Sequence, residues 1–200
     1  MSENTIRYPE IVVRTFTKQI GIEKIFKNDY PVWIEIGFGV GKFFLSLAKT
    51  YPEINLIGIE HNLSRYHRMK KKITKLGLKN TYIISTDASM AIKYLFSPES
   101  IDRLFVNFPD PWQKGKHEKN RLLTTEFILS AHTILKNNSV LRIVTDVQKY
   151  AQKVKETLDK SYIFSGVKTN DIDLPTTTFQ DRFIAQNLPI YEMIYKKIGV

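Results

Sequence analysis

The stretch Pro31-Val32-Trp33-Ile34-Glu35-Ile36-Gly37-Phe38-Gly39-Val40-Gly41 is the part of the chain that best predicts its fold. It begins as an apolar run typical of a buried β-strand and ends in three closely spaced glycines. From Val40 to Thr50 the apolar residues then follow helical spacing. Glycines between a strand and a helix let a ligand come close to the backbone, and the first N–H groups of the helix point toward it. The stretch therefore predicts a nucleotide-type cofactor site at the carboxyl end of a strand.

Short strand patterns and helix patterns alternate along the rest of the chain. The predicted strands are Pro31–Ile36, Ile54–Glu60, Asn80–Ser85, Arg103–Phe108 and Val140–Thr145. The predicted helices are Val40–Thr50, Leu63–Leu76, Ser89–Phe96, Leu122–Leu135 and Val147–Lys160. Strand–helix–strand units with short connections favour right-handed crossovers and a mostly parallel sheet. We therefore expect an α/β, doubly wound, Rossmann-like fold.

The two ends of the chain follow a different pattern. Tyr162–Val167 and Tyr191–Lys197 are predicted to be strands, joined by the long polar stretch Lys168–Pro189, in which no helical pattern is visible. A connection of this length is more often functional than not. Near the other end, Ile20–Phe26 is the one segment of the first thirty residues with a possible helical pattern. We expect a single domain over residues 1–200, with residues 1–30 as an N-terminal extension.

Composition narrows the classes of partner and chemistry. The chain has 200 residues and a formal net charge of +10, which favours polyanionic partners such as nucleic acid. No apolar run approaches the ~18 residues of a membrane span, and the N-terminus lacks the pattern of a secretory signal, so we expect a cytoplasmic protein. The chain has no cysteine, which excludes disulfides, thiolate metal sites and thiolate nucleophiles.

Two acids flank the glycine-rich stretch in the predicted fold. Glu35 stands just before the glycines, and Glu60 ends the second strand, where an acid accepts hydrogen bonds from ribose hydroxyls. The glycine spacing differs from the Gly-x-Gly-x-x-Gly pattern of dinucleotide enzymes. Two carboxylates would repel a pyrophosphate but favour a sulfonium and an amino group, so S-adenosylmethionine fits better than NAD. A tight structural turn beside a solvated glutamate is the alternative.

Asp87 follows the third predicted strand. A carboxylate or a backbone amide here could meet the amino edge of an adenine. Equally, Asp87 could be the N-cap of the helix that begins near Ser89.

The stretch Asn107-Phe108-Pro109-Asp110-Pro111-Trp112-Gln113-Lys114-Gly115-Lys116-His117-Glu118-Lys119-Asn120-Arg121-Leu122 resembles the signature of bacterial tRNA (guanine-N7)-methyltransferases. In that family Pro-Asp-Pro-Trp precedes a basic run with a histidine and a closing Arg-Leu or Arg-Ile. The resemblance extends to Glu35-Ile36-Gly37, Gly58-Ile59-Glu60, Thr145-Asp146, Thr177-Thr178-Phe179-Gln180-Asp181-Arg182-Phe183 and Pro189-Ile190-Tyr191. It implies a class I methyltransferase with a mostly parallel seven-stranded sheet and an antiparallel C-terminal strand. The implied reaction is methyl transfer from S-adenosylmethionine to guanine N7 in tRNA, usually at position 46 of the variable loop.

The resemblance also implies roles for individual residues. The implied cofactor residues are Glu35, Gly37, Gly39, Gly41, Glu60, Asp87 and Asp110, and the implied substrate residues are Lys114, Asp146, Thr177, Thr178, Phe179 and Gln180. The chain departs from the family at Gly115 and Asn120, where Lys or Arg is common, and at Gln180, where Glu is common. The oligomeric state, monomer or homodimer, stays open.

The implied chemistry needs positioning rather than proton removal. Guanine N7 carries an in-plane lone pair and no proton, so no general base is required, and holding the nucleophile and the methyl group in line contributes about 7–11 kcal/mol. Methylation leaves positive charge on the purine, which a nearby carboxylate stabilises. Asp110 and Asp146, each at the end of a predicted strand, are the candidates, and we expect Asp110 to be catalytic.

Aromatic and basic residues near Asp110 suggest how RNA would be held. Trp112 could stack on the target base or pack on the core. We expect Lys114, Lys116, Lys119 and Arg121 to contact phosphates, with a solvated face as the alternative. A second basic stripe of Arg65, Arg68, Lys72, Lys75 and Lys79 would extend the tRNA footprint or be only a solvent face. His61, His67 and His132 have no metal-ligand spacing, so we expect no metal.

Two other functions fit part of the sequence. The stretch Asn107-Phe108-Pro109-Asp110-Pro111-Trp112 is loosely similar to the Asn-Pro-Pro-aromatic loop of exocyclic-amine methyltransferases. An RNA-binding module without activity would need the basic run but neither Glu35, nor the glycines, nor Glu60. Pyrimidine C5 methylation through a cysteine adduct is excluded by the absence of cysteine.

Overall fold

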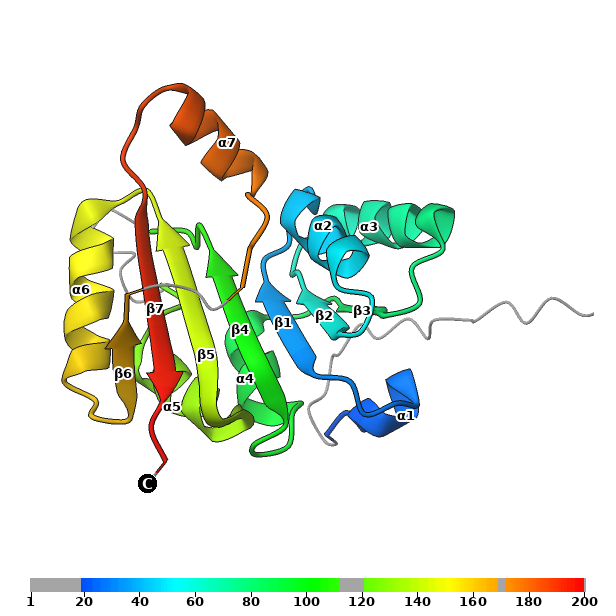
Figure 1. Cartoon of the computed structure of the whole chain (residues 1–200), viewed down its shortest axis with the longest axis horizontal. Coiled ribbons are helices and arrows are strands. Elements are labelled where there is room, and N and C mark those ends of the chain that lie inside the picture. The colour runs from blue at the N-terminus through cyan, green and yellow to red at the C-terminus, as the bar shows by residue number, and fades with distance from the viewer. Residues whose placement is uncertain (1–18, 112–120, 169–171, 200) are drawn as a thin grey trace, which may run out of the picture.

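The computed structural model describes residues 19–111, 121–168 and 172–199, and its centre is a seven-stranded sheet (Figure 1). The strands are β1 (Val32–Ile36), β2 (Asn55–Ile59), β3 (Thr81–Ile84), β4 (Ile101–Asn107), β5 (Leu135–Thr145), β6 (Phe164–Val167) and β7 (Tyr191–Lys197). Their order is β3-β2-β1-β4-β5-β7-β6. The first five strands are parallel, whereas β7 is antiparallel to both β5 and β6. The predicted mostly parallel α/β sheet with an antiparallel C-terminal strand is confirmed.

Helices cover both faces of this sheet. They are α1 (Ile22–Phe26), α2 (Lys42–Thr50), α3 (Leu63–Leu76), α4 (Ala88–Tyr94), α5 (Thr125–Ile134), α6 (Gln148–Asp159) and α7 (Thr178–Ala185). One apolar core joins α4, α5 and α6 to one face, and a second core joins α2 and α3 to the other face. The sheet is therefore the middle layer of three.

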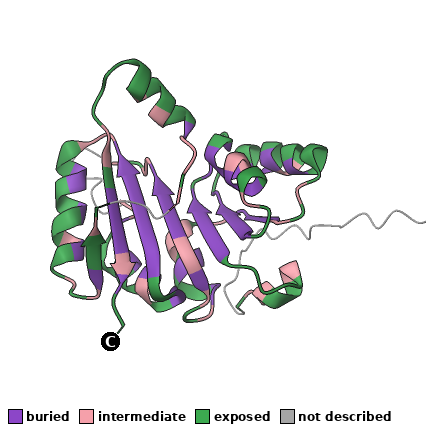
Figure 2. Ribbon diagram, viewed as in Figure 1, coloured by how far each residue is buried: buried purple, intermediate pink, exposed green. Residues whose placement is uncertain are grey.

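The central strands are buried on both faces, as Figure 2 shows. In β1, Ile34 points into the core of α4, α5 and α6, whereas Trp33 points into the core of α2 and α3. Strands covered on both faces are continuously apolar, which is why the sequence predicted them so well. Within β1, Glu35 is the exception, because it places a carboxyl group inside an apolar strand.

Two segments differ from the sequence prediction. Helix α5 ends at Ile134 and β5 begins at Leu135, well before the predicted strand start at Val140. The second difference is larger, because the stretch Lys168–Pro189, predicted to lack a helix, contains α7. No residue of α7 is buried, so the apolar spacing that marks a core helix is missing. In Figure 1, α7 lies beyond the carboxyl ends of β4 and β5.

None of the helices within the three described segments has the length and apolar character that a membrane crossing requires.

Candidate active site

The predicted acids gather at one edge of the sheet. Glu35 is the penultimate residue of β1, Glu60 follows β2, Asp110 lies just after β4, and Asp146 follows β5. Parallel strands end at the same edge, and ligands of open α/β sheets bind at that edge. The structure thus brings together four acids that are far apart in the sequence.

Two of the three glycines in the loop between β1 and α2 have different roles. Gly37 has φ +68°, and a Cβ at this position would find no heavy atom within 4 Å. Gly41 has φ +86°, and a Cβ there would lie 1.8 Å from Cε of Met69. Gly41 therefore allows α2 to pack against α3, whereas Gly37 leaves open space beside the loop, where a ligand can approach the backbone.

Glu60 fixes the position of this loop relative to β2. Its side chain is 1% exposed. Oε2 accepts a hydrogen bond from the N–H of Gly39 at 3.1 Å, and Oε1 accepts one from the N–H of Asn62 at 2.9 Å. A carboxylate has about four lone-pair sites, so both oxygens keep the capacity to accept from hydroxyl groups.

Glu35 is 2% exposed and only half satisfied. Its Oε1 accepts from Nδ2 of Asn107 at 3.2 Å, whereas Oε2 has no hydrogen-bond partner in the described part of the chain. Burial raises the pKa of Glu35 to about 8, although the Asn107 hydrogen bond and the Arg142 charge oppose the rise. A buried oxygen without a partner costs free energy. The carboxyl group is therefore suited to a cationic ligand, such as one that carries an ammonium group.

Asp87 is the N-cap of α4, because its side chain accepts a hydrogen bond from the N–H of Met90 at 2.9 Å. This is the alternative that the sequence left open. Asp87 also lies just past the end of β3, at the same edge as the other acids. Contact with an adenine stays a prediction.

The turn after β4 places Asp110 on the surface at this edge. Phe108 has φ +49°, which is uncommon for a bulky residue and doubly so before a proline. The N–H of Phe108 donates to the carbonyl of Val144 at 2.8 Å, which holds the turn against β5. The Phe108 ring stacks on Phe179 of α7 with centroids 5.5 Å apart. The predicted substrate segment thus contacts the loop that carries Asp110.

The four residues of that segment do different things. The side chains and backbones of Thr177 and Gln180 form a reciprocal capping box, with hydrogen bonds of 2.9 and 3.0 Å, that starts α7. Thr178 is exposed, and Phe179 is 55% exposed although it stacks on Phe108. Gln180 makes here the capping contact that a glutamate would make.

Several predicted RNA contacts lie outside the described residues, namely Trp112, Lys114, Lys116 and Lys119. The two flanks of this stretch are described. Nε of Arg121 donates to the carbonyl of Pro111 at 2.8 Å, and its guanidinium lies 5.4 Å from the Tyr150 ring centroid. Arg121, predicted to contact phosphate, therefore also joins the two flanks to each other and to α6.

The buried residues Asn107 and Arg142 and the exposed Glu192 continue the polar contacts from Glu35 across the sheet, and no motif in the sequence marks these contacts. Nη1 of Arg142 donates to Oδ1 of Asn107 at 2.9 Å, and Nε of Arg142 donates to Oε1 of Glu192 at 2.5 Å. The signal that could have revealed them was a lone arginine within the apolar strand Val140–Thr145.

Within the described ranges, no group of three or more His, Cys, Asp or Glu side chains could hold a metal ion.

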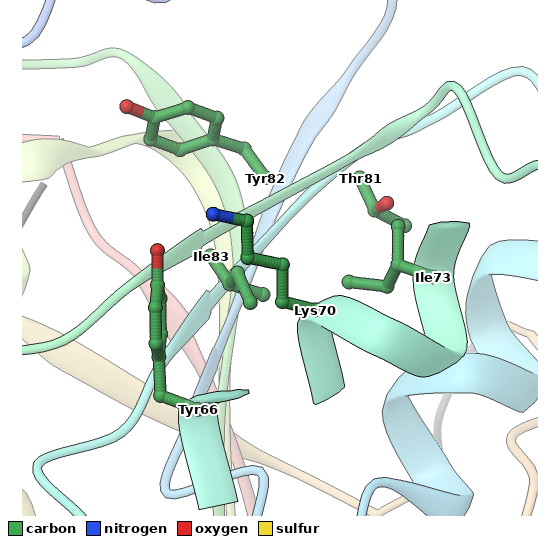
Figure 3. A pocket seen from close by; sticks show the side chains of 6 residues that line it. All are labelled: Tyr66, Lys70, Ile73, Thr81, Tyr82 and Ile83. Carbon is green, nitrogen blue, oxygen red and sulfur yellow. The ribbon is translucent and has the colours of Figure 1, made fainter. Parts of the chain in front are cut away.

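A small pocket lies apart from the acidic edge, between α3 and the edge strand β3 (Figure 3). It is lined by Tyr66, Lys70, Ile73, Thr81, Tyr82 and Ile83, and it includes none of the predicted site residues.

The strand order, with one antiparallel strand beside β5, is that of a class I methyltransferase fold. The crystal structure of the aminoglycoside resistance methyltransferase NpmB1 is similar to this chain with a TM-score of 0.63 and 18% identity, covering 88% of this chain and 92% of that one. The family model described as "Putative methyltransferase" matches residues 29–193.

Curated relatives specify the family. A tRNA (guanine-N(7)-)-methyltransferase from Enterococcus faecalis is 37% identical over 148 residues, which are 74% of this chain and 69% of the relative. One from Thermotoga maritima is 31% identical over 141 residues, which are 70% of this chain and 45% of the relative. The chain thus spans about half the length of the Thermotoga maritima relative. It belongs to the tRNA (guanine-N7-)-methyltransferase family.

Proposed function

We propose that this protein transfers a methyl group from S-adenosylmethionine to N7 of a guanine in tRNA, at position 46 of the variable loop, in the cytoplasm. The observation that carries the proposal is that Glu35, a buried carboxyl group without a full set of hydrogen-bond partners, and the exposed Asp110 both lie at one edge of the sheet, where Phe108 of the Asp110 turn contacts α7. Membership of the tRNA (guanine-N7-)-methyltransferase family supports the choice of reaction and substrate.

The residues at the edge fit the parts of the cofactor. Glu35 would accept a hydrogen bond from the ammonium group of S-adenosylmethionine, and Glu60 would accept hydrogen bonds from the ribose hydroxyls. Gly37 and Gly39 would let the loop backbone approach it closely, while Gly41 holds α2 in place beside the loop. Asp87 would meet the adenine amino edge, and Asp110 would complete the site near the sulfonium.

The proposed reaction depends on where charge develops. S-adenosylmethionine supplies an electrophilic methyl group. The lone pair of guanine N7 would form the new bond to this methyl group while the methyl–sulfur bond breaks and S-adenosylhomocysteine leaves. N7 loses no proton, so the protein needs no general base. Positive charge then grows on the purine, and the carboxylates of Asp110 and Asp146 would stabilise it more in the transition state than in the ground state.

The substrate side would be formed by α7 and by the basic stretch after Asp110. Phe179 is largely exposed at the edge, where an aromatic ring can stack on a base. Lys114 would hold a phosphate, and Thr177, Thr178 and Gln180 would position the segment that presents Phe179. The formal charge of +10 supports a polyanionic substrate.

The test is methylation of a defined tRNA. The purified protein is incubated with methyl-labelled S-adenosylmethionine and a tRNA transcript with guanine at position 46, and the modified base is mapped by cleavage at N7-methylguanosine. We expect label at position 46, and none in a transcript with adenine there. An N-methylated exocyclic amine would instead establish the alternative reaction. No label, together with no heat on titration with S-adenosylhomocysteine, would leave an RNA-binding module.

A further inference from the structure

A row of polar side chains crosses four neighbouring strands in the middle of the sheet. It consists of Glu35 in β1, Asn107 in β4, Arg142 in β5 and Glu192 in β7. The strand register places Glu35 beside Phe105 and Phe105 beside Arg142, so these side chains lie on the same face. Asn107, two residues after Phe105, shares that face because side chains alternate along a strand.

The row is continuous and is buried except at its Glu192 end, where the side chain is 41% exposed. Glu35, Asn107 and Arg142 are 2%, 9% and 3% exposed. The contacts run from Oε1 of Glu35 to Nδ2 of Asn107 at 3.2 Å, from Oδ1 of Asn107 to Nη1 of Arg142 at 2.9 Å, and from Nε of Arg142 to Glu192 at 2.5 Å. The guanidinium also lies over the Phe43 ring of α2, 5.8 Å from its centroid.

The arginine decides which way the Asn107 amide points. A guanidinium has only donors, so the group that faces it must be an acceptor, which is Oδ1. The NH₂ group of Asn107 is thereby directed at Glu35. A donor at this position stabilises the ionised carboxylate over the neutral acid.

The surroundings of Glu35 shift its pKa in opposing directions. Burial has the largest effect and favours the neutral acid, and the nearby carboxylate of Glu60 also favours it. Asn107 and the charge of Arg142 are the two opposing influences, and the pKa of Glu35 is still raised to about 8. Without them the carboxyl group would be still harder to ionise.

We propose that Arg142 and Asn107 are positioning residues that favour the ionised form of Glu35 and leave its Oε2 ready for the ammonium group of the cofactor. The inference rests on the proposed function, since it assumes that S-adenosylmethionine binds at this edge. Under this proposal, the row of polar side chains makes the site prefer ligands that carry an amino group. If the row merely stabilised the sheet, substitutions in it would change the affinity for all ligands of the site equally.

Two ligands separate these cases. S-adenosylhomocysteine carries the ammonium group, whereas 5′-methylthioadenosine shares the nucleoside but lacks the amino acid. Both are titrated calorimetrically against the wild type, Arg142→Met and Asn107→Leu. We expect both variants to bind S-adenosylhomocysteine ~10-fold or more weakly, equivalent to at least one pKa unit at Glu35, while 5′-methylthioadenosine affinity changes by less than about twofold. Arg142→Lys, which keeps the charge, should restore part of the loss.

The pH dependence gives a second readout. The affinity of the wild type for S-adenosylhomocysteine should rise from about pH 6 to about pH 8, because the favoured ionised Glu35 becomes populated as the pH approaches its pKa of about 8. In both variants this rise should move to higher pH. The affinity for 5′-methylthioadenosine should be flat over the same range.

Three controls make the result decisive. Arg103→Met removes another arginine that lies over an aromatic ring, that of Trp33, at 5.3 Å, and should leave ligand selectivity unchanged. In a Glu35→Gln background, Arg142→Met should have no further effect on S-adenosylhomocysteine. Asn107→Leu leaves Arg142 with Glu192, so it provides the test even if Arg142→Met fails to fold.

The failing outcomes are distinguishable. Equal weakening of both ligands, or additive effects with Glu35→Gln, would overturn the inference and leave the row a structural feature. A wild type that binds neither ligand would overturn the proposed function instead.

Discussion

Asp110 owes its position to the residue two places before it. Phe108 adopts a left-handed backbone, held by the carbonyl of Val144 and by the ring of Phe179. Strained conformations of this kind cost about 1–3 kcal/mol and persist where the surroundings fix them, often at functional sites. The turn ends β4 and brings Asp110 to the surface beside α7.

Asp110→Asn should therefore lower activity and leave the fold intact. At saturating S-adenosylmethionine we expect turnover to fall ~100-fold or more, because a neutral amide cannot offset the charge that develops on the purine. The side chain is exposed, so the thermal unfolding transition should stay where it is. A labelled-methyl assay measures the effect, and near-normal turnover would contradict a role for Asp110.

Gly37 and Gly77 form a matched pair for substitution. Gly37 and Gly77 have φ of +68° and +63°, and a Cβ on either would find no heavy atom within 4 Å. Gly37→Ala and Gly77→Ala should thus each lower the free energy of unfolding by about 1–2 kcal/mol, the cost of a left-handed alanine. Only Gly37→Ala should also weaken binding of S-adenosylhomocysteine, because its methyl group enters the space beside the loop. Equal binding by both variants in calorimetry would contradict a cofactor at this loop.

At the scale of elements, α7 is attached to the molecule by few contacts. Phe108 stacks under Phe179, and Lys42 at the start of α2 pairs with Asp181 and donates to Thr176 at 2.9 Å. The Lys42 pairing lowers the pKa of Asp181. These contacts join α2, which follows the glycine-rich loop, to the proposed substrate helix α7.

Lys42→Met should loosen α7 without emptying the cofactor site. We expect a few-fold higher KM for tRNA and an unchanged affinity for S-adenosylhomocysteine, since the lost contacts are half-exposed and lie on the substrate side. Lys49→Met, at the other end of α2, is the control and should change neither quantity. Steady-state kinetics with varied tRNA measure the effect, and an unchanged KM for tRNA would show that this pairing does not position α7.

The sequence predicted elements best where burial dictates the pattern. Strands β1 and β2 are buried on both faces, so their positions, and the placement of Glu35 and Glu60 at their carboxyl ends, were correctly predicted. Helix α7 was missed because it buries nothing, although the Thr177–Gln180 capping pattern was present. The contacts of Arg142 were missed for another reason, since its partners come from strands that only the folded sheet makes neighbours.

On the scale of the whole molecule, the positive charge is unevenly distributed. Residues 61–86 contain no aspartate or glutamate, and α3 carries a series of exposed cations. Helix α3 also begins at the edge where the acids gather, because Nη1 of Arg65 lies 3.8 Å from Oε2 of Glu60, and Nζ of Lys72 donates to the carbonyl of Val40 at 2.9 Å. A polyanion bound over the edge would therefore meet α3 next.

We expect the exposed cations of α3 to contribute to tRNA binding. A variant with Arg68, Lys71 and Lys75 all changed to Gln should bind tRNA more weakly, with a salt dependence less steep by about 0.7–0.9 in log–log slope for each lost phosphate contact. The control carries Lys24, Lys27 and Lys136 changed to Gln, which removes the same charge at the opposite, amino end of the sheet. Binding isotherms at several salt concentrations measure both slopes. A steep slope that survives in the α3 variant would mean that this face meets only solvent. Equal flattening in both variants would mean that tRNA responds to the overall charge of +10 rather than to α3.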